Sequence, residues 1–277
     1  MVIGIIGQGF VGNAVFQKFK NFFNVLTFDI DKSLCDSTLE EIKNNCNVIF
    51  ICVPTPMNND GSCNISIVES VVSEFENLSD KIIVIKSTIP PGTTQKINDK
   101  FIKNQIVFNP EFLTERNAVN DYNNQKRIIL GGPRPATTTL KNIFSKVFPS
   151  AHIIKTGSTH AEMIKYFTNC FLATKVSFAN EIYDLCQKLN LDYDKVVEYS
   201  LGDDRIGNSH LNVPGPDGDY GFGGHCFPKD LAALIKLTED NGSLNNVLKS
   251  VNKTNQVVRQ NKDWEKMIGR AVSFKKN

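Results

Sequence analysis

Short apolar runs alternate with helical segments along the first half of the chain. Seven runs rich in β-branched residues have the length of buried strands: Val2–Gly7, Val25–Asp29, Val48–Val53, Ile82–Ile85, Gln105–Phe108, Arg127–Leu130 and His152–Ile154. Three of the segments between them are predicted to be helical: Asn13–Phe19, Ile67–Leu78 and Pro135–Phe148. This alternation is typical of an α/β fold with a doubly wound parallel sheet, as in Rossmann-type domains.

The pattern changes at Gly157. From Ser158 to Leu201 the chain has neither glycine nor proline, and its apolar residues recur mostly at helical spacing. We predict a long helix to about Asn190 and three later helices: Val196–Leu201, Leu231–Asn241 and Leu244 to about Ala271. The sequence thus predicts a Rossmann domain over 1–156 and an all-helical domain over 157–277. The long helix is apolar around much of its circumference, which favours a homodimer, although packing within one domain would also explain it.

A glycine-rich turn follows the first apolar run. Gly7, Gly9 and Gly12 form a G-x-G-x-x-G pattern between a strand and a helix, and Asp29 ends the second run. Such glycines allow a tight turn and close approach of a pyrophosphate, and the acid accepts hydrogen bonds from a ribose. The acid favours NAD over NADP, whose 2′-phosphate it would repel, although Lys32 lies nearby.

Polar residues follow several of the predicted strands. They include Thr55, Ser87, Thr88, Glu111 and Glu115. Ligands of open parallel sheets bind beyond the carboxyl ends of the strands, so a site is expected there. Turn and cap chemistry would also explain these residue types, and this observation alone leaves both interpretations open.

The stretch Gly221–Asp230 is a candidate nucleophile site. Three glycines precede Cys226, and Pro228, Lys229 and Asp230 follow it at the start of a predicted helix. A helix N-terminus and a nearby lysine both favour a thiolate. Upstream, Glu162, Lys165 and Asn169 are spaced to share one helix face. The simplest interpretation of that face is a solvated stripe with a Glu–Lys pair.

Composition excludes several classes of protein. The chain has 277 residues, 22% charged, with a formal net charge of +2, so neither nucleic acid nor membrane is expected as a partner. The basic residues near the end are interpreted as a solvated helix: Arg259, Lys262, Lys266, Arg270, Lys275 and Lys276. No apolar run is long enough for a membrane span, and the apolar start is too short for a signal peptide. Seven scattered cysteines without a C-x-x-C pair argue against a disulfide framework or a zinc site and favour a cytoplasmic protein.

Several motifs are spread over almost the whole chain. In order, they are Gly7–Gly12 with Phe10, Pro54–Pro56, Ser87–Pro90, Asn109–Glu115, Glu162–Tyr166 with Asn169, Asn180 and Glu181, Arg205–Gly207, and Gly221–Asp230. Together they resemble the UDP-glucose/GDP-mannose (nucleotide-sugar) dehydrogenase family, of which UDP-glucose 6-dehydrogenase is the best-known member. The segment Phe222–Asp230 is especially specific, because hydroxy-acid dehydrogenases of related fold carry the lysine but no such cysteine.

The resemblance implies an NAD-dependent, four-electron oxidation of the C6 alcohol of a nucleotide sugar, with UDP-glucose favoured over GDP-mannose and UDP-N-acetylhexosamine. Cys226 would be the nucleophile, forming a thiohemiacetal that is oxidised to a thioester and hydrolysed. Lys165 and Asn169 would stabilise the oxyanion, and Lys165 would also take the alcohol proton. The groups expected to position a water are Asp230, Glu111 and Thr88.

The resemblance also implies two sets of binding residues. The cofactor set is Gly7, Gly9, Phe10, Val11, Gly12, Asp29, Lys32, Val53, Pro54, Thr55, Ser87, Thr88, Glu115 and Lys229. The substrate set is Glu111, Phe112, Leu113, Glu115, Lys165, Asn169, Arg205, Phe222, Gly223 and Cys226. Arg205 is expected to reach the substrate across a dimer interface.

Two features differ from the family pattern. We expect a short form without the family's C-terminal nucleotide-binding domain, and the 213–220 loop is longer than the usual connection. We hypothesise that this loop and the partner subunit supply contacts to the nucleotide. The alternatives are a two-electron hydroxy-acid dehydrogenase that uses Lys165, and a truncated NAD-binding dimer without catalysis.

Overall fold

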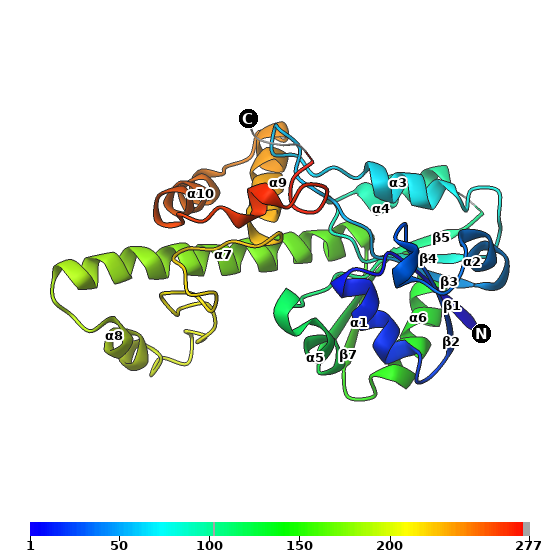
Figure 1. Cartoon of the computed structure of the whole chain (residues 1–277), viewed down its shortest axis with the longest axis horizontal. Coiled ribbons are helices and arrows are strands. Elements are labelled where there is room, and N and C mark those ends of the chain that lie inside the picture. Colours follow the sequence, from blue (N-terminus) through cyan, green and yellow to red (C-terminus); the bar gives the residue numbers. More distant parts are fainter. Residues whose placement is uncertain (102, 274–277) are drawn as a thin grey trace. The chain divides into compact units, whose positions relative to one another are not determined.

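Packing of the backbone divides the protein into two compact units. The computed structural model describes residues 1–101 and 103–273 (Figure 1). The first unit comprises Met1–Thr55 and Ile65–Lys165, and the second comprises Pro56–Asn64 and Tyr166–Asn277. The domain boundary at 156/157 stays a prediction, because the units are defined by packing alone.

A seven-stranded sheet forms the centre of the first unit. Its order is β2-β1-β3-β4-β5-β6-β7. The strands are β1 Val2–Ile6, β2 Asn24–Phe28, β3 Val48–Ile51, β4 Ile82–Ile85, β5 Gln105–Phe108, β6 Arg127–Gly131 and β7 His152–Thr156. The first five strands are mutually parallel, which confirms the predicted Rossmann-type α/β fold.

The sheet departs from the predicted parallel order at one point. Strand β6 is antiparallel to β5, and β7 is parallel to β6. The connection between β5 and β6 contains only the short η2 (Glu115–Asn117) and α5 (Ala118–Asn123), and α5 packs on α1 (Phe10–Phe19). Because no long crossover helix returns the chain along the sheet, β6 starts from the end at which β5 stops.

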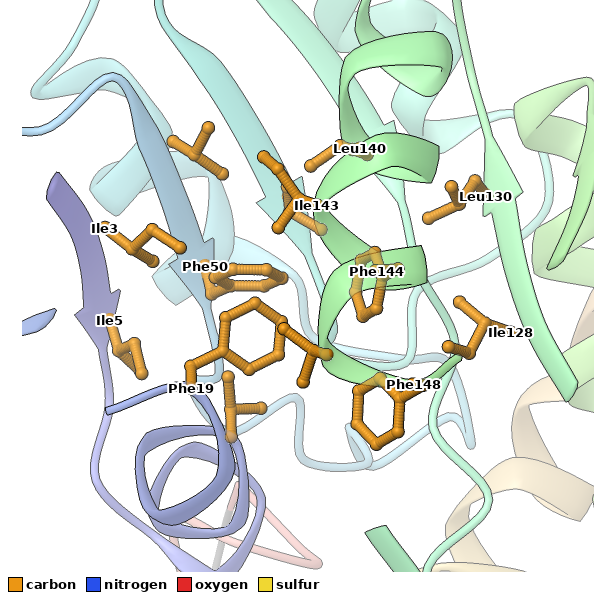
Figure 2. Packing of buried hydrophobic residues seen from close by; sticks show 14 of the residues in the cluster. Ile3, Ile5, Phe19, Phe50, Ile128, Leu130, Leu140, Ile143, Phe144 and Phe148 are labelled. Atoms are coloured by element: carbon orange, nitrogen blue, oxygen red, sulfur yellow. The ribbon is translucent and has the colours of Figure 1, made fainter. Parts of the chain in front are cut away.

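Helices cover both faces of this sheet. One face packs against α1, α5 and α6 (Arg134–Val147), and the other packs against α2 (Leu39–Asn45), α3 (Ser66–Ser73) and α4 (Thr93–Lys100). On the first face, the ring of Phe19 lies edge-on to those of Phe50 and Phe144, with centroids 5.3 and 5.6 Å away (Figure 2). Successive strand residues alternate between the two cores, as a sheet buried on both faces requires. The loops at the carboxyl ends of the strands therefore rest on a packed framework.

The second unit is helical. Its elements are the greater part of α7 (Ser158–Lys188), which runs as one continuous helix, then α8 (Tyr193–Ser200), α9 (Phe227–Asp240), α10 (Asn246–Val258) and η3 (Asp263–Lys266) (Figure 1). The predicted long helix is thus confirmed. A small core of Cys170, Ala173, Phe222, Leu231 and Val251 joins α7, α9 and α10. Within the described ranges, no helix is both long and apolar enough to cross a bilayer.

The last predicted helix was wrong in length. Helix α10 ends at Val258, and the backbone of Arg259 is extended, with φ −86° and ψ 109°. The Nε of Arg259 donates to the carbonyl of Asn261 at 2.8 Å, which stabilises a turn away from the helix axis. Trp264 then packs with Met57, Met267, Ala271 and Val272 in a separate small core.

Candidate active site

The turn between β1 and α1 has the geometry of a phosphate-binding loop. Gly7 has φ +90°, and a Cβ there would lie 2.6 Å from the carbonyl oxygen of Cys52. A Cβ on Gly12 would lie 1.8 Å from the carbonyl oxygen of Gly7, so helix and strand pack too closely for a side chain. Gly9 is the N-cap of α1, and a Cβ there would meet nothing within 4 Å. The helix N-terminus is therefore open to an anion.

The carboxylate of Asp29 lies beside this turn. It accepts the N–H of Gln8 at 2.6 Å and the N–H of Asp31 at 2.9 Å, directly after β2. Lys32 is exposed at the start of η1 (Lys32–Leu34). An open glycine turn with a fixed acid fits the pyrophosphate and ribose of NAD. Phe10 and Val11, also in the predicted cofactor set, begin α1 and are half-buried.

Predicted cofactor residues also follow β3 and β4. Thr55, Ser87 and Thr88 are buried, whereas Val53 is half-buried and Pro54 is exposed. The Ser87 hydroxyl donates to the carbonyl of Val53 at 2.7 Å, so the ends of the two strands are tied together.

Lys86 is a buried lysine outside the set of site residues predicted from the sequence. Its Nζ donates to Oδ1 of Asn109 at 2.9 Å and lies 5.5 Å from the centroid of the Tyr122 ring. Burial lowers the pKa of Lys86 to about 8, although the negative charge of Glu111 opposes the change. A lysine directly after a buried strand, in a loop already suspected of binding a ligand, was the available signal.

Glu111 and Lys165 form a buried ion pair. The Nζ of Lys165 lies 3.2 Å from Oε1 of Glu111 and donates to the Glu111 carbonyl at 2.6 Å. It is also 5.4 Å from the centroid of the Phe112 ring. Oε2 of Glu111 accepts the N–H of Leu113 at 2.8 Å. The loop after β5 thus fixes a carboxylate and an ammonium group that can exchange protons or hold a developing negative charge.

The solvated Glu–Lys stripe, the simplest interpretation of this helix face by itself, was wrong. Glu162 is completely buried and accepts three hydrogen bonds from other residues: the N–H of Gly92 at 2.6 Å, and the N–H and hydroxyl of Thr94 at 2.8 and 2.6 Å. It therefore caps the N-terminus of α4, and Lys165 pairs with Glu111 instead. Two charged residues one helical turn apart are buried because each has its own partner, which spacing alone does not show.

Cys226 is the N-cap residue of α9. Phe227 and Pro228 begin the helix, and the Cys226 carbonyl accepts the N–H of Asp230 at 2.9 Å. The predicted placement at a helix N-terminus is confirmed, and the helix begins four residues before the predicted Leu231. At this position the unpaired N–H groups of the first turn favour a thiolate.

Asp230 is the centre of a buried polar cluster in the second unit. It accepts a hydrogen bond from Asn169 Nδ2 at 2.6 Å and pairs with Lys229 Nζ at 2.5 Å. Burial alone would lower the pKa of Lys229, but the negative charge of Asp230, together with Cys63 and Cys226 when they are ionised, more than offsets it, and the pKa lies above its usual value. Lys229 is therefore a fixed positive charge three residues from Cys226.

The basic end of the chain is not a uniformly solvated helix. Arg259 is buried and pairs with three carboxylates, those of Asp217, Asp219 and Asp263. Lys275 and Lys276 lie outside the described residues. Two acids of the 213–220 loop, for which we predicted contacts to the nucleotide, thus pair with a cation of the same chain that charge counting did not reveal.

The remaining substrate-binding candidates differ in exposure. Phe222 is buried, with its ring centroid 6.0 Å from that of Phe227. Gly223 lies against Arg259, since a Cβ there would be 2.3 Å from its Nη2. Arg205 is exposed and pairs with Asp203, and Glu115 is exposed in η2.

Two family models match consecutive parts of the chain. The NAD-binding domain of the UDP-glucose/GDP-mannose dehydrogenase family matches residues 33–150, and the central domain of the same family matches residues 159–257. The chain belongs to the UDP-glucose/GDP-mannose dehydrogenase family. The NAD-binding match supports NAD as the cofactor for which the glycine turn and Asp29 are suited.

Named members of the UDP-glucose/GDP-mannose dehydrogenase family share about a third of the aligned residues. UDP-glucose 6-dehydrogenase TuaD of Bacillus subtilis is 37% identical over 221 residues, which cover 76% of this chain and 47% of the relative. UDP-glucose 6-dehydrogenase of Rickettsia prowazekii is also 37% identical, over 77% of this chain and 50% of the relative. The chain spans about half the length of these relatives.

A solved UDP-glucose dehydrogenase has the same fold. The enzyme from the hyperthermophilic archaeon Pyrobaculum islandicum is 27% identical, with a TM-score of 0.84 over 92% of this chain and 68% of that one. A GDP-mannose dehydrogenase of Pseudomonas aeruginosa is 25% identical, with a TM-score of 0.66 over 93% of this chain and 69% of that one. Solved relatives thus act on more than one nucleotide sugar.

Proposed function

We propose that the chain acts as an NAD-dependent nucleotide-sugar 6-dehydrogenase that oxidises the C6 alcohol of its substrate to a carboxylate, with UDP-glucose as the favoured sugar nucleotide. The observation that carries this proposal is the position of Cys226 as the N-cap of α9, one turn from the buried Asn169–Asp230–Lys229 cluster. The names of the Bacillus and Rickettsia relatives favour UDP-glucose.

The proposed chemistry requires a nucleophile. Oxidation of the alcohol gives an aldehyde, which must form a covalent adduct before a second hydride can leave. The thiolate of Cys226 would add to the aldehyde carbon to give a thiohemiacetal. Departure of the second hydride would convert this adduct to a thioester, which water would hydrolyse to the carboxylate and the free thiol. The N-terminus of α9 and the positive charge of Lys229 favour the thiolate. NAD, when bound, accepts the hydrides, and the glycine turn with Asp29 would hold it.

The polar clusters suit the other proposed roles. Asp230, oriented by Asn169 and Lys229, would position the hydrolytic water. Lys165, held on Glu111, would take the alcohol proton and stabilise the oxyanion. The rest of the predicted cofactor and substrate sets keep their proposed roles in binding.

An exposed apolar stripe on α7 supports the proposed homodimer. Phe167, Phe171, Phe178 and Leu185 are each at least half exposed, and their spacing places them on one helix face. The rings of Phe167 and Phe171 stack with their centroids 6.0 Å apart. Large apolar side chains gathered on a single face are typical of a subunit interface.

The decisive test is the stoichiometry of NADH formation. UDP-glucose, GDP-mannose and UDP-N-acetylhexosamines are supplied in turn, and we expect two NADH per sugar acid from the one that is the substrate, with UDP-glucose favoured. Cys226→Ser should lower turnover to the sugar acid by about three to six orders of magnitude, since loss of a catalytic nucleophile can cost about 10⁶-fold. The matched control is Cys186→Ser, because Cys186 is buried in the same unit away from α9.

The other outcomes separate the alternatives. One NADH per product, with full activity in Cys226→Ser, would indicate a two-electron hydroxy-acid dehydrogenase. NAD binding without NADH formation from any sugar in the panel would indicate a non-catalytic dimer.

A further inference from the structure

Arg259 joins the segment before Cys226 to the C-terminal part of the second unit. Its Nη1 lies 2.8 Å from Oδ2 of Asp217, its Nε lies 3.4 Å from Oδ2 of Asp219, and its Nη2 lies 3.4 Å from Oδ1 of Asp263. The Arg259 side chain is 2% exposed. We call these four residues the Arg259 hub.

The hub reaches the backbone of the loop that leads to Cys226. Both carboxylate oxygens of Asp263 accept the N–H of Gly224, at 3.2 and 3.1 Å, two residues before the cysteine. A Cβ on Gly223 would lie 2.3 Å from Nη2 of Arg259 and 2.4 Å from Oδ1 of Asp263. The backbone at Gly223 and Gly224 therefore rests directly on the hub.

Side chains, and not secondary structure, also hold the start of this loop. Oδ1 of Asn255 accepts the N–H of Phe222 at 2.8 Å, and its Nδ2 donates to the Phe222 carbonyl at 3.0 Å. Oδ1 of Asn180 accepts the N–H of Gly221 at 3.1 Å. A glycine-rich segment has many alternative conformations, so these bonds determine where the cysteine enters α9.

The charges of the hub are unequal. One guanidinium faces three carboxylates, and the fork of Arg259 contacts all three at once, which a lysine ammonium at the end of a flexible stem does not reproduce. Without the guanidinium, the carboxylates would repel one another and Asp263 would move away from Gly224. The loop would then lose the bond between Asp263 and the Gly224 N–H, two residues before Cys226.

We propose that Arg259 is a positioning residue for Cys226: by holding Asp263 on the Gly224 N–H, it keeps the cysteine at the N-terminus of α9, where the thiolate is stabilised. This inference rests on the proposed function only in taking Cys226 as the nucleophile. The side chain of Arg259 bonds to Asn261, Tyr220 and the three carboxylates, so it would act on the thiol through the loop.

The reactivity of the thiol tests this directly. The rate of Cys226 alkylation by iodoacetamide is measured against pH by peptide mass spectrometry, without substrate or NAD. In Arg259→Lys and Asp263→Ala, we expect the midpoint of the pH profile to rise by about one unit, which lowers the thiolate fraction near neutral pH about tenfold. Asp263→Asn keeps an oxygen acceptor for Gly224, so its midpoint should rise less.

Two controls separate positioning from unfolding. Lys249→Gln removes one positive charge from α10, the helix that precedes Arg259; Lys249 pairs with Glu239 at the surface, so the midpoint should stay unchanged. Cys170 and Cys186 are buried in the second unit and should stay unlabelled in every variant. Lys229 interacts with Asp230, Cys63 and Cys226, and His225 precedes the cysteine in sequence; none of these residues is changed in the variants.

An unchanged midpoint in Arg259→Lys and Asp263→Ala would overturn the proposal. A shift accompanied by labelling of Cys170 and Cys186 would also overturn it, because the unit would then be opening as a whole. NADH formation is measured separately on the wild type. A wild type that forms no NADH, yet gives the expected shifts in its variants, would refute the proposed function and leave Arg259 as the residue that positions this thiol.

Discussion

Replacing Lys86 by methionine should remove a pH dependence of folding from the first unit. The pKa of Lys86 is about 8 in the folded protein, against an ordinary value of 10.5, because the side chain is buried. Between these pH values the unfolded chain binds a proton that the folded chain does not, so stability rises with pH. Below pH 8 both states are protonated, and the cost of the buried charge is constant at about 3 kcal/mol.

At neutral pH, Lys86→Met should change the free energy of unfolding by less than this cost. Methionine removes the buried charge but leaves Oδ1 of Asn109 without the donor it now has at 2.9 Å, which costs about 1–3 kcal/mol. The diagnostic quantity is therefore the difference between wild type and variant as pH changes. From pH 7 to pH 9 the wild type should gain about 1 kcal/mol relative to Lys86→Met.

Urea unfolding followed by far-UV circular dichroism at pH 7, 8 and 9 measures this difference. Burial raises the pKa of the Cys46 thiol to about 11, so stability also falls above about pH 9, but this contribution is the same in both proteins and cancels. Lys96→Met is the control for loss of a positive charge from an exposed position in the same unit. A difference between wild type and Lys86→Met that stays constant from pH 7 to pH 9 would refute the reasoning.

Three further substitutions test other parts of the structure. Glu162→Gln should lower the free energy of unfolding by about 2 kcal/mol in urea at pH 7, because the NH2 group of the glutamine would face an N–H donor where a carboxylate oxygen now accepts. An unchanged free energy would mean that the three hydrogen bonds contribute nothing. Asp230→Asn leaves Lys229 buried without its charge partner and should cost about 3 kcal/mol or more in the same assay, unless the lysine finds another anion. Phe171→Glu should weaken self-association in sedimentation analysis, whereas Phe22→Glu on the first unit should not; equal behaviour would argue against the α7 interface.

Local sequence determined most of the Rossmann fold. Apolar β-branched runs and the glycine turn were sufficient for the strands, since a strand buried on both faces has few other compositions. The antiparallel β6 was not predictable in this way, because its direction depends on α5 packing against α1. The length of the last helix was overestimated for a related reason. Its end is set by the contacts of Arg259 with residues some forty positions earlier.

The residues of the candidate site also fall into those that local sequence predicts and those that depend on tertiary contacts. Cys226, the glycine turn and Asp29 were predictable because each depends on neighbours in sequence. The partners of Glu162, Lys86 and Arg259 were not, since periodicity assigns a residue to a face but does not say what that face meets. Each of these side chains is buried by tertiary contacts that a solvated-charge interpretation excludes.

The buried charges argue for function more than for stability. Removing a charge from water costs several kcal/mol, and apolar residues of similar volume are often no worse for folding than a buried ion pair. In the first unit such charges gather after β4 and β5, as Lys86 and the Glu111–Lys165 pair, where ligands of this fold bind. In the second unit they gather around the start of α9, as the Lys229–Asp230 pair and the Arg259 hub. Stability alone gives no reason for this distribution. An active site that holds a carboxylate, an ammonium group and a thiolate in fixed positions away from water would require buried charges at these places.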